Sequence, residues 1–439
     1  VVERHGDEPP RGRIVLGDNL AVLAAWCAGR AAALDLLYMD PPFMTGGRFD
    51  AVRRVGEGAQ APSVKVPGYD DRWSSRGAFI AMLDDRVRLS RELLADHGSL
   101  YVHLDPTMSH AAKLLLDEVF GEDNFQREII WRIGWVSGFK SRVRNWVRNH
   151  DVLLFYAKEA SQLAFTRQFV PHLPGYQRRS GKPSPNPGIP VDDVWNASPG
   201  EAVLKGAASL DSIQIKSFSH EKTGWATQKN ESLVERLVLA SSAEDGWVAD
   251  PFMGSGTTVA VAARLGRRFL GCDRSPLALQ LARQRLLALG VPFEVAIAQG
   301  ADPPATSGGE LNSLGRVLRC THGPAQGWEI ALRASPNLSR PPGTSADEGG
   351  VDAGAPCVEI EAWCVLDGAR RVRWDCTRAL RDDRRLEMRA VVGEIVPKFV
   401  RIYGVMGDVV EVALEEGEAP GERRVSSYEY LHATSDSSR

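Results

Sequence analysis

Apolar runs of strand length alternate with helical segments over the first part of this 439-residue chain. The run LDLLYM at 34–39 suits a strand buried on both faces of a parallel sheet. It ends at Asp40, where Pro41 and Pro42 stop both strand and helix. Because open α/β sheets bind ligands at the carboxyl ends of their strands, we predict that Asp40 faces a ligand site.

The same alternation continues along the chain and predicts an α/β fold with a doubly wound sheet. The expected strands are 13–18, 34–40, 99–105, 127–133, 150–158, 246–252 and 267–273. The expected helices are 19–33, 78–98, 109–121, 231–242, 257–266 and 275–290.

Four segments depart from this rhythm and define the predicted domain organisation. The α/β domain spans 12–295; within it, 44–78 reads as a loop and the proline-rich stretch 159–222 as an irregular insertion. Residues 300–355 are rich in Gly, Pro, Ser and Ala, which predicts a linker. Short β-like runs over 356–430 predict a small β-rich C-terminal domain.

Composition excludes a wholly disordered chain, a collagen-like repeat protein and a small disulfide-rich protein. With 43% hydrophobic and 25% charged residues, the chain has the composition of an ordinary globular protein. Its six cysteines form no C-x-x-C pair and its nine histidines show no ligand spacing, so we expect reduced thiols and no metal. The charged segment at 1–13 and the lack of a long apolar run predict a cytoplasmic, nucleoid-associated protein with no membrane contact.

Charge is unevenly distributed along the chain. The net charge is −3, but residues from 301 onward carry 17 basic and 22 acidic side chains, which leaves 36 and 34 for residues 1–300. Within 127–148 there are six basic residues and one acidic residue. A polyanionic partner is therefore expected on the N-terminal part of the chain.

The segment DPFMGSGTT at 250–258 follows an apolar strand and opens a helix, so Gly254 and Gly256 allow close approach of a ligand to the backbone. A Walker A loop would place lysine after Gly256, where this chain has Thr257, and a dinucleotide fingerprint would place glycine at Val259. A nucleoside cofactor without those phosphates, such as S-adenosylmethionine, fits better. Asp273, 17 residues after Gly256, suits the ribose hydroxyls. Alternatively, the glycines only make a tight turn.

The segment Asp40-Pro41-Pro42-Phe43 offers a carboxylate and proline carbonyls that no local N–H competes for. These groups can accept hydrogen bonds from an exocyclic amine, which turns the nitrogen lone pair towards an electrophilic methyl group. Phe43 offers a stacking face for a flipped base, a contact that contributes about 1–3 kcal/mol. Alternatively, the two prolines only terminate a strand.

Together, these two segments resemble the DNA amino-methyltransferases that methylate adenine N6 or cytosine N4. DPPF precedes GSG by about 210 residues, which resembles the permuted, beta-class arrangement of restriction-modification enzymes. The resemblance covers about 12–290 and includes GDNLAVL, LLYMDPPFMTG, GSLYVHLD, DVW and TQK. It implies a Rossmann-like methyltransferase domain and S-adenosylmethionine as cofactor. DPPF favours adenine N6, because cytosine N4 enzymes more often carry SPPY.

The resemblance also implies roles for individual residues. Asp40, Pro41, Pro42 and Phe43 would be catalytic. The implied cofactor-binding set is Asp18 near the adenine, Asp250, Phe252, Gly254, Ser255, Gly256 and Thr257 around the methionine and ribose, Asp273 on the ribose, and Thr227 and Lys229 near the carboxylate. The loop GWATQKNES lacks the prolines that the family usually has around TQK. The resemblance therefore does not predict how this loop closes over the cofactor.

Two segments are candidates for contact with double-stranded DNA. Phe139 and Trp146 are suited to stacking on DNA bases, and the neighbouring basic residues are suited to contacts with DNA phosphates: Lys140, Arg142, Arg144 and Arg148. A solvated charged hairpin explains these residues equally well. Arg178 and Arg179 in the insertion at 159–222, where the family places target recognition, suit base edges.

Several alternatives stay open at this stage. The same pocket suits an amine of RNA or of a protein amide. The resemblance leaves three possible partners open: a cognate restriction endonuclease, a defence complex, and a second copy of this chain in a homodimer. In a defence complex, the chain could be a non-catalytic DNA-binding subunit. Cytosine C5 chemistry is disfavoured because the one Pro-Cys pair, Pro356-Cys357, lies in the predicted β-rich domain.

Overall fold

The computed structural model forms two compact units. One consists of Asp18–Phe49 and Tyr69–Asp273, and the other of Val1–Gly17, Asp50–Gly68 and Arg274–Arg439. The structure describes residues 3–54, 63–133, 143–172, 186–196, 215, 219–298, 318–323, 327–332, 360–366, 372–377, 389–391, 397–404, 409–416 and 422–432.

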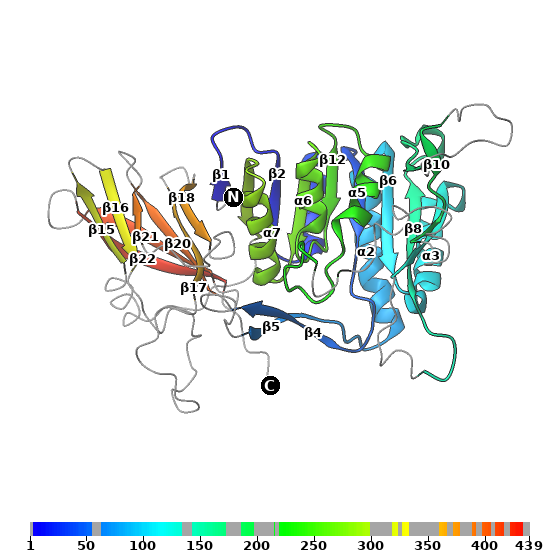
Figure 1. Ribbon diagram of the computed structural model, residues 1–439, viewed down its shortest axis with the longest axis horizontal. Helices are drawn as coiled ribbons and strands as arrows, with labels where there is room; N and C mark the ends of the chain where they lie inside the picture. Colours follow the sequence, from blue (N-terminus) through cyan, green and yellow to red (C-terminus); the bar gives the residue numbers. More distant parts are fainter. Residues whose placement is uncertain are drawn as a thin grey trace. The chain divides into compact units, whose positions relative to one another are not determined.

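The first unit is built on a run of seven strands (Figure 1) in the order β13-β12-β3-β6-β8-β7-β11. Neighbouring strands are parallel except for β8, which runs antiparallel to both β6 and β7. This confirms the predicted α/β sheet. The strands are β3 (Leu34–Met39), β6 (Leu94–Leu104), β7 (Phe125–Arg132), β8 (His150–Ala157), β11 (Val194–Trp195), β12 (Trp247–Asp250) and β13 (Arg268–Asp273).

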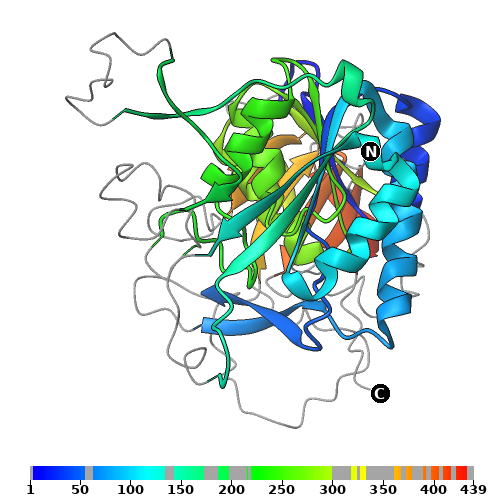
Figure 2. The ribbon, with the colours of Figure 1, turned by 90° about the vertical axis from the view of Figure 1, so that its right-hand side faces the viewer.

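Helices cover both faces of this sheet (Figure 2), as a doubly wound arrangement requires. One face carries α1 (Asn19–Arg30), α2 (Arg76–Leu93) and α3 (Pro106–Phe120), and the other α5 (Glu231–Ser241) and α6 (Thr257–Arg264). The side chains of Asp18, Ser75 and Asp105 cap α1, α2 and α3 by accepting hydrogen bonds from backbone N–H groups.

The parallel strands bring the two sequence motifs to one edge of the sheet. Ala249 of β12 pairs with Leu37 of β3 and with Leu270 of β13. The chain therefore leaves β3 at Asp40 and leaves β12 and β13 at neighbouring positions on the same edge. This is the edge at which open α/β sheets bind ligands.

The second unit contains two separate sets of strands. In the first, β14 (Phe293–Ile297) lies between β1 (Glu3–His5) and β2 (Gly12–Leu16), and α7 (Pro276–Ala288) packs on β2. The second is an eight-stranded sheet in the order β18-β17-β20-β21-β22-β15-β16-β19. Its strands are β15 (Leu318–Gly323), β16 (Gly327–Leu332), β17 (Ile360–Leu366), β18 (Val372–Thr377), β19 (Arg389–Val391), β20 (Phe399–Gly404), β21 (Val409–Glu416) and β22 (Glu422–His432).

Three details differ from the expectations. Strands β15 and β16 lie within 300–355, so treating all of that segment as linker was wrong; their short β-runs are hidden in a Gly- and Pro-rich composition. The predicted loop 44–78 contains the paired strands β4 (Arg48–Arg54) and β5 (Ser63–Asp70). Helix α2 ends at Leu93, and residues 94–98, which were predicted to be its last turn, are the first residues of β6.

The described residues of the insertion form short elements. Strand β9 (Phe169–Pro171) pairs with β10 (Gly188–Pro190), and β11 joins the main sheet beside β7. Among the helices that the structure describes, none is both long enough and apolar enough to cross a membrane.

Candidate active site

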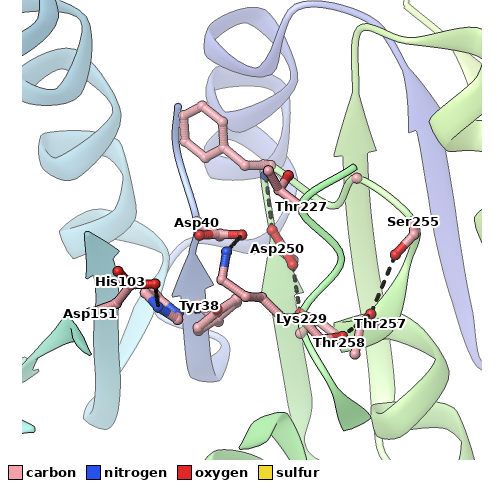
Figure 3. Close-up of polar contacts among 12 residues, drawn as sticks. Tyr38, Asp40, His103, Asp151, Thr227, Lys229, Asp250, Ser255, Thr257 and Thr258 are labelled. Carbon is pink, nitrogen blue, oxygen red and sulfur yellow. Dashed lines mark hydrogen bonds and ion pairs between the residues drawn. The ribbon is translucent and has the colours of Figure 1, made fainter. Parts of the chain in front are cut away.

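Asp40 has one oxygen engaged and one oxygen available. All six residues of β3 are buried, so the strand fixes the position at which Asp40 emerges. Its Oδ2 accepts a hydrogen bond from Lys229 Nζ at 2.5 Å (Figure 3). Its Oδ1 is buried and has no hydrogen-bond partner within the described part of the chain. A buried carboxylate oxygen in this state calls for a donor from a ligand.

Phe43 lies beside the same ion pair. Lys229 Nζ is 5.0 Å from the centroid of the Phe43 ring, and the His103 ring centroid is 5.9 Å from it. Phe43 and Pro42 are half-buried, whereas Pro41 is buried. The predicted catalytic segment therefore places a carboxylate and a partly accessible aromatic face together.

Asp71, which sequence reasoning missed, holds the chain just after Phe43. Its Oδ1 accepts from Met44 N and its Oδ2 from Thr45 N, both at 2.8 Å, and Oδ2 also accepts from the Thr45 hydroxyl at 2.6 Å. Met44 has a φ of +60°, a conformation that is strained for a residue with a side chain. The buried carboxylate of Asp71 is therefore a positioning group for the DPPF loop.

A second buried group behind Phe43 was also missed. The Tyr38 hydroxyl lies 2.8 Å from His103 Nδ1, and His103 Nε2 lies 3.5 Å from Asp151 Oδ2 (Figure 3). Burial raises the pKa of Asp151, but the interaction with His103, 3.5 Å away, and the charges of Lys229 and Arg148 bring that pKa below its usual value. Burial, with the charge of Asp40 next, raises the pKa of Tyr38 well above its usual value.

The glycine loop after β12 has backbone conformations that favour glycine. Gly254 and Gly256 have φ of +48° and +77°. Gly254 N donates to Asp273 Oδ2 at 2.9 Å. A Cβ at Gly254 would lie 3.0 Å from Trp225 Nε1, so this backbone is closely covered on one side. The predicted ribose ligand Asp273 thus also shapes the loop.

Asp250 organises this loop from within. Its Oδ1 accepts from Phe252 N at 2.9 Å and its Oδ2 from the Thr258 hydroxyl at 2.6 Å. Burial raises its pKa to about 7; the two hydrogen bonds oppose the shift and the charges of Asp40 and Asp273 add to it. Both oxygens serve the loop, so its predicted contact with a cofactor stays a prediction.

The raised pKa of Asp250 predicts a pH-dependent effect of Asp250→Asn. The folded protein binds the Asp250 proton more tightly than the unfolded chain, whose pKa is near 3.8. This contribution to the free energy of unfolding is therefore present at low pH and is lost as the pH rises from about 4 to about 7. Asparagine does not titrate, so the variant does not undergo this loss. Over this pH window, the free energy of unfolding of the variant should rise relative to that of the parent by up to about 4 kcal/mol. Thermal unfolding at pH 5 and pH 8 should show about 2–3 kcal/mol of this gain, because part of it is already present at pH 5; a difference between variant and parent that does not change with pH would contradict it.

The loop at 221–230 closes without the flanking prolines. Gln228 Oε1 accepts from Thr223 N at 2.8 Å, and Gln228 Nε2 donates to the Glu221 carbonyl at 2.6 Å. The Thr257 hydroxyl donates to the Lys229 carbonyl at 3.0 Å, which joins this loop to the glycine loop. The altered sequence around TQK is thus compensated by side-chain hydrogen bonds.

Aromatic rings line the other side of this loop. Tyr69 stacks between Phe49 and Trp225, with centroid distances of 5.0 Å and 6.0 Å. Its hydroxyl donates to Thr227 Oγ1 at 3.1 Å. Burial raises the pKa of Tyr69, which keeps the phenol protonated. Thr227, predicted near a cofactor, is therefore held by a strand that the sequence suggested was loop.

Asp18 lies at the start of α1, where Arg86 ties it to the glycine loop. Asp18 Oδ1 caps the helix and lies 3.5 Å from Arg86 Nη2. Arg86 Nε donates to Asn19 Oδ1 at 2.6 Å, and Asn19 Nδ2 donates to the Pro251 carbonyl at 2.9 Å. Both residues are buried; Asn19 lies in the GDNLAVL segment but was given no role there, and Arg86 lies in none of the quoted motifs.

The predicted DNA-binding residues are only partly described. Arg144 is exposed. Arg148 hydrogen-bonds to Asp151 and has Nη1 3.6 Å from Asp105 Oδ2. The remaining four, Lys140, Arg142, Arg178 and Arg179, lie outside the described residues.

Comparison with known proteins identifies the family. The sequence profile of the N6_N4_Mtase family, described as DNA methylase, matches residues 34–284. The chain belongs to this family of DNA methylases. That match spans both the DPPF segment and the glycine loop, so this DNA methylase has both sequence elements at one sheet edge.

Characterised relatives of this DNA methylase are similar over most of their length. The type II methyltransferase M2.LlaDCHI of Lactococcus lactis subsp. cremoris is 46% identical over 263 residues, 58% of this chain and 82% of the relative. The type II methyltransferase M.EcaI of Enterobacter cloacae is 28% identical over 328 residues, 63% and 69% of the two chains. The DNA adenine methyltransferase YhdJ of Escherichia coli (strain K12) is 26% identical over 304 residues, 64% and 87% of the two chains.

The cofactor of this DNA methylase is S-adenosylmethionine. The residues present fit such a group. Gly254 is half-buried at the edge where a nucleoside cofactor would lie, and a side chain there would crowd Trp225. The carboxylate of Asp273 lies next to Gly254 N, where a ribose acceptor is expected.

Proposed function

We propose that this DNA methylase transfers a methyl group to N6 of adenine in duplex DNA, with the target base turned out of the helix. The observation that carries the proposal is the buried Oδ1 of Asp40, which has no hydrogen-bond partner among the described residues, beside the half-buried ring of Phe43. These two groups match an exocyclic amine and the planar ring that bears it. Base extrusion costs a few kcal/mol, comparable with the stacking and hydrogen bonds offered here.

The chain's own residues align the amine. Lys229 holds Asp40 through Oδ2, so that Oδ1 accepts one amine N–H, and the Pro41 carbonyl accepts the other. This arrangement draws the nitrogen lone pair out of conjugation with the ring and towards the methyl group, and Phe43 fixes the ring by stacking. The glycine loop and Asp273 would hold S-adenosylmethionine, which would supply the electrophilic methyl group; the S–C bond breaks as the N–C bond forms, S-adenosylhomocysteine leaves, and the methylated amine releases one proton. Proximity and orientation provide most of the acceleration, and no covalent enzyme intermediate is needed.

The choice of adenine rests on two supports. The segment reads DPPF rather than the SPPY that is more frequent among cytosine N4 enzymes. A relative named as a DNA adenine methyltransferase is 26% identical over 64% of this chain. Cytosine N4 is the second candidate, because its exocyclic amine presents the same donors.

The test is methylation by the purified chain with tritiated S-adenosylmethionine and, separately, DNA, RNA and protein. We expect label in duplex DNA alone and N6-methyladenine in the nucleoside digest. N4-methylcytosine would move the proposal to its alternative, and absence of label from DNA would refute it. Sequencing modified bases in DNA from expressing cells gives the target site.

We further propose that the chain works beside a restriction endonuclease, since two of its relatives are named type II methyltransferases.

A further inference from the structure

The connection between β7 and β8 leaves the sheet on the same edge as the catalytic segment. Strand β8 is antiparallel to β6 and to β7, so β7 runs parallel to β6 and β3. The chain therefore leaves β7 at Arg132 and enters β8 at His150 on the edge where Asp40 emerges. The structure describes 143–149 of this connection.

Trp146 in this connection is almost fully exposed. Its exposed fraction is 97%, the largest among the large hydrophobic residues whose exposure the structure describes. Val143 and Val147 beside it are also exposed, at 49% and 36%. A tryptophan in this state adds nothing to the packing of the fold and leaves a large apolar ring in water. Such a side chain suggests a ligand that covers it.

The surroundings of Trp146 suit nucleic acid. The described segment 143–149 reads VRNWVRN, with two arginines and no acidic residue. Arg144, which is exposed, places a basic side chain close to the aromatic ring in the sequence, as a site for a phosphate beside a stacked base requires.

Arg148 fixes this segment to the wall of the active site. It hydrogen-bonds to Asp151, whose Oδ2 lies 3.5 Å from His103 Nε2. The ring of His103 in turn lies 5.9 Å from that of Phe43. Three successive side-chain contacts thus connect the base of the Trp146 segment to the stacking face of the active site.

We propose that Trp146 enters the DNA duplex where the target base leaves it and stacks in the vacated space. This inference rests on the proposed function, because it assigns a residue to the base-extrusion step of the same reaction. An unstacked gap in a duplex costs a few kcal/mol, and an inserted aromatic ring recovers stacking with the neighbouring base pairs. Trp146 acts here on the duplex and makes no contact with the reacting atoms.

The test compares two duplexes that carry the target site, one with the target base paired and one with an abasic position opposite it. An unpaired target base is already easy to extrude, so it should need no wedge. The measured quantity is the single-turnover rate of methylation. The variants are Trp146→Ala, Trp146→Phe, and as matched control Leu114→Ala, which removes a 73% exposed side chain from α3.

We expect Trp146→Ala to slow methylation of the paired duplex about tenfold or more, the loss expected for one stacking contact. Methylation of the abasic duplex should change less than about threefold. Trp146→Phe should retain most of the rate on the paired duplex, and Leu114→Ala all of it. Equal slowing on both duplexes would overturn the proposal, as would unchanged rates, which would leave a protein partner as the occupant of this surface. If the parent chain methylates neither duplex, the proposed function itself has failed.

Discussion

Asp40→Asn is expected to lower methyl transfer to DNA by about 10²–10³-fold, as loss of one preorganised hydrogen-bonding group does in other active sites. Lys229 Nζ, 2.5 Å from Asp40 Oδ2, requires an acceptor, so the asparagine carbonyl will turn towards it. The asparagine NH2 then faces the substrate amine, and two donors oppose each other. The single-turnover rate measures the loss, and calorimetry should show that S-adenosylmethionine binding changes little.

A matched control for Asp40→Asn is Glu118→Gln on α3. It removes an acidic charge from a side chain that is 70% exposed and bonded to Arg88. We expect this control to retain the parent rate. Full turnover by Asp40→Asn would contradict the role of Asp40, whereas equal loss in both variants would point to a general effect of charge.

The second large effect is expected from Gly254→Ala, which should weaken S-adenosylmethionine binding about tenfold or more, because glycine is needed where a backbone approaches a ligand closely. The new Cβ would lie 3.0 Å from Trp225 Nε1 at a φ of +48°. The Trp225 ring, which stacks on Tyr69, would have to move. Calorimetry gives the affinity directly.

Gly290→Ala separates backbone strain from crowding at the cofactor loop. Gly290 also has a positive φ, +66°, but no atom lies within 4 Å of its Cβ position. Both alanine variants should lose about 1–2 kcal/mol of stability from the left-handed conformation. Only Gly254→Ala should lose affinity for S-adenosylmethionine; parent affinity in that variant would show that the glycine loop does not hold the cofactor.

The sequence predicted those parts of the site that are contiguous in the chain. Asp40 to Phe43 and the glycine loop are short segments in which residue type, strand end and turn coincide, and parallel strands bring such ends together. Lys229 was expected near the cofactor carboxylate. Its Nζ donates a hydrogen bond to Asp40 Oδ2, and its contact with the cofactor stays a prediction.

The residues that sequence reasoning missed act through contacts over long separations. Asp71 reaches back to Met44 and Thr45, and His103 and Asp151 come from two antiparallel strands. Asp71 lies in none of the quoted motifs, and His103 lies in the GSLYVHLD segment but was given no role there, so the folded structure was needed to find these contacts. Similarly, β15 and β16 lie in a stretch whose composition resembles a linker and become strands by pairing within the C-terminal sheet.

The central claim is that methyl donor and target amine meet between Asp40 and the glycine loop. The most direct measurement is a crystal structure with S-adenosylmethionine bound and the distance from its transferable methyl carbon to Asp40 Oδ1. An amine that is hydrogen-bonded to Oδ1 and in position for attack requires about 6 Å or less between those atoms. A cofactor bound in another cleft, with its methyl group more than about 10 Å from Asp40, would contradict the account.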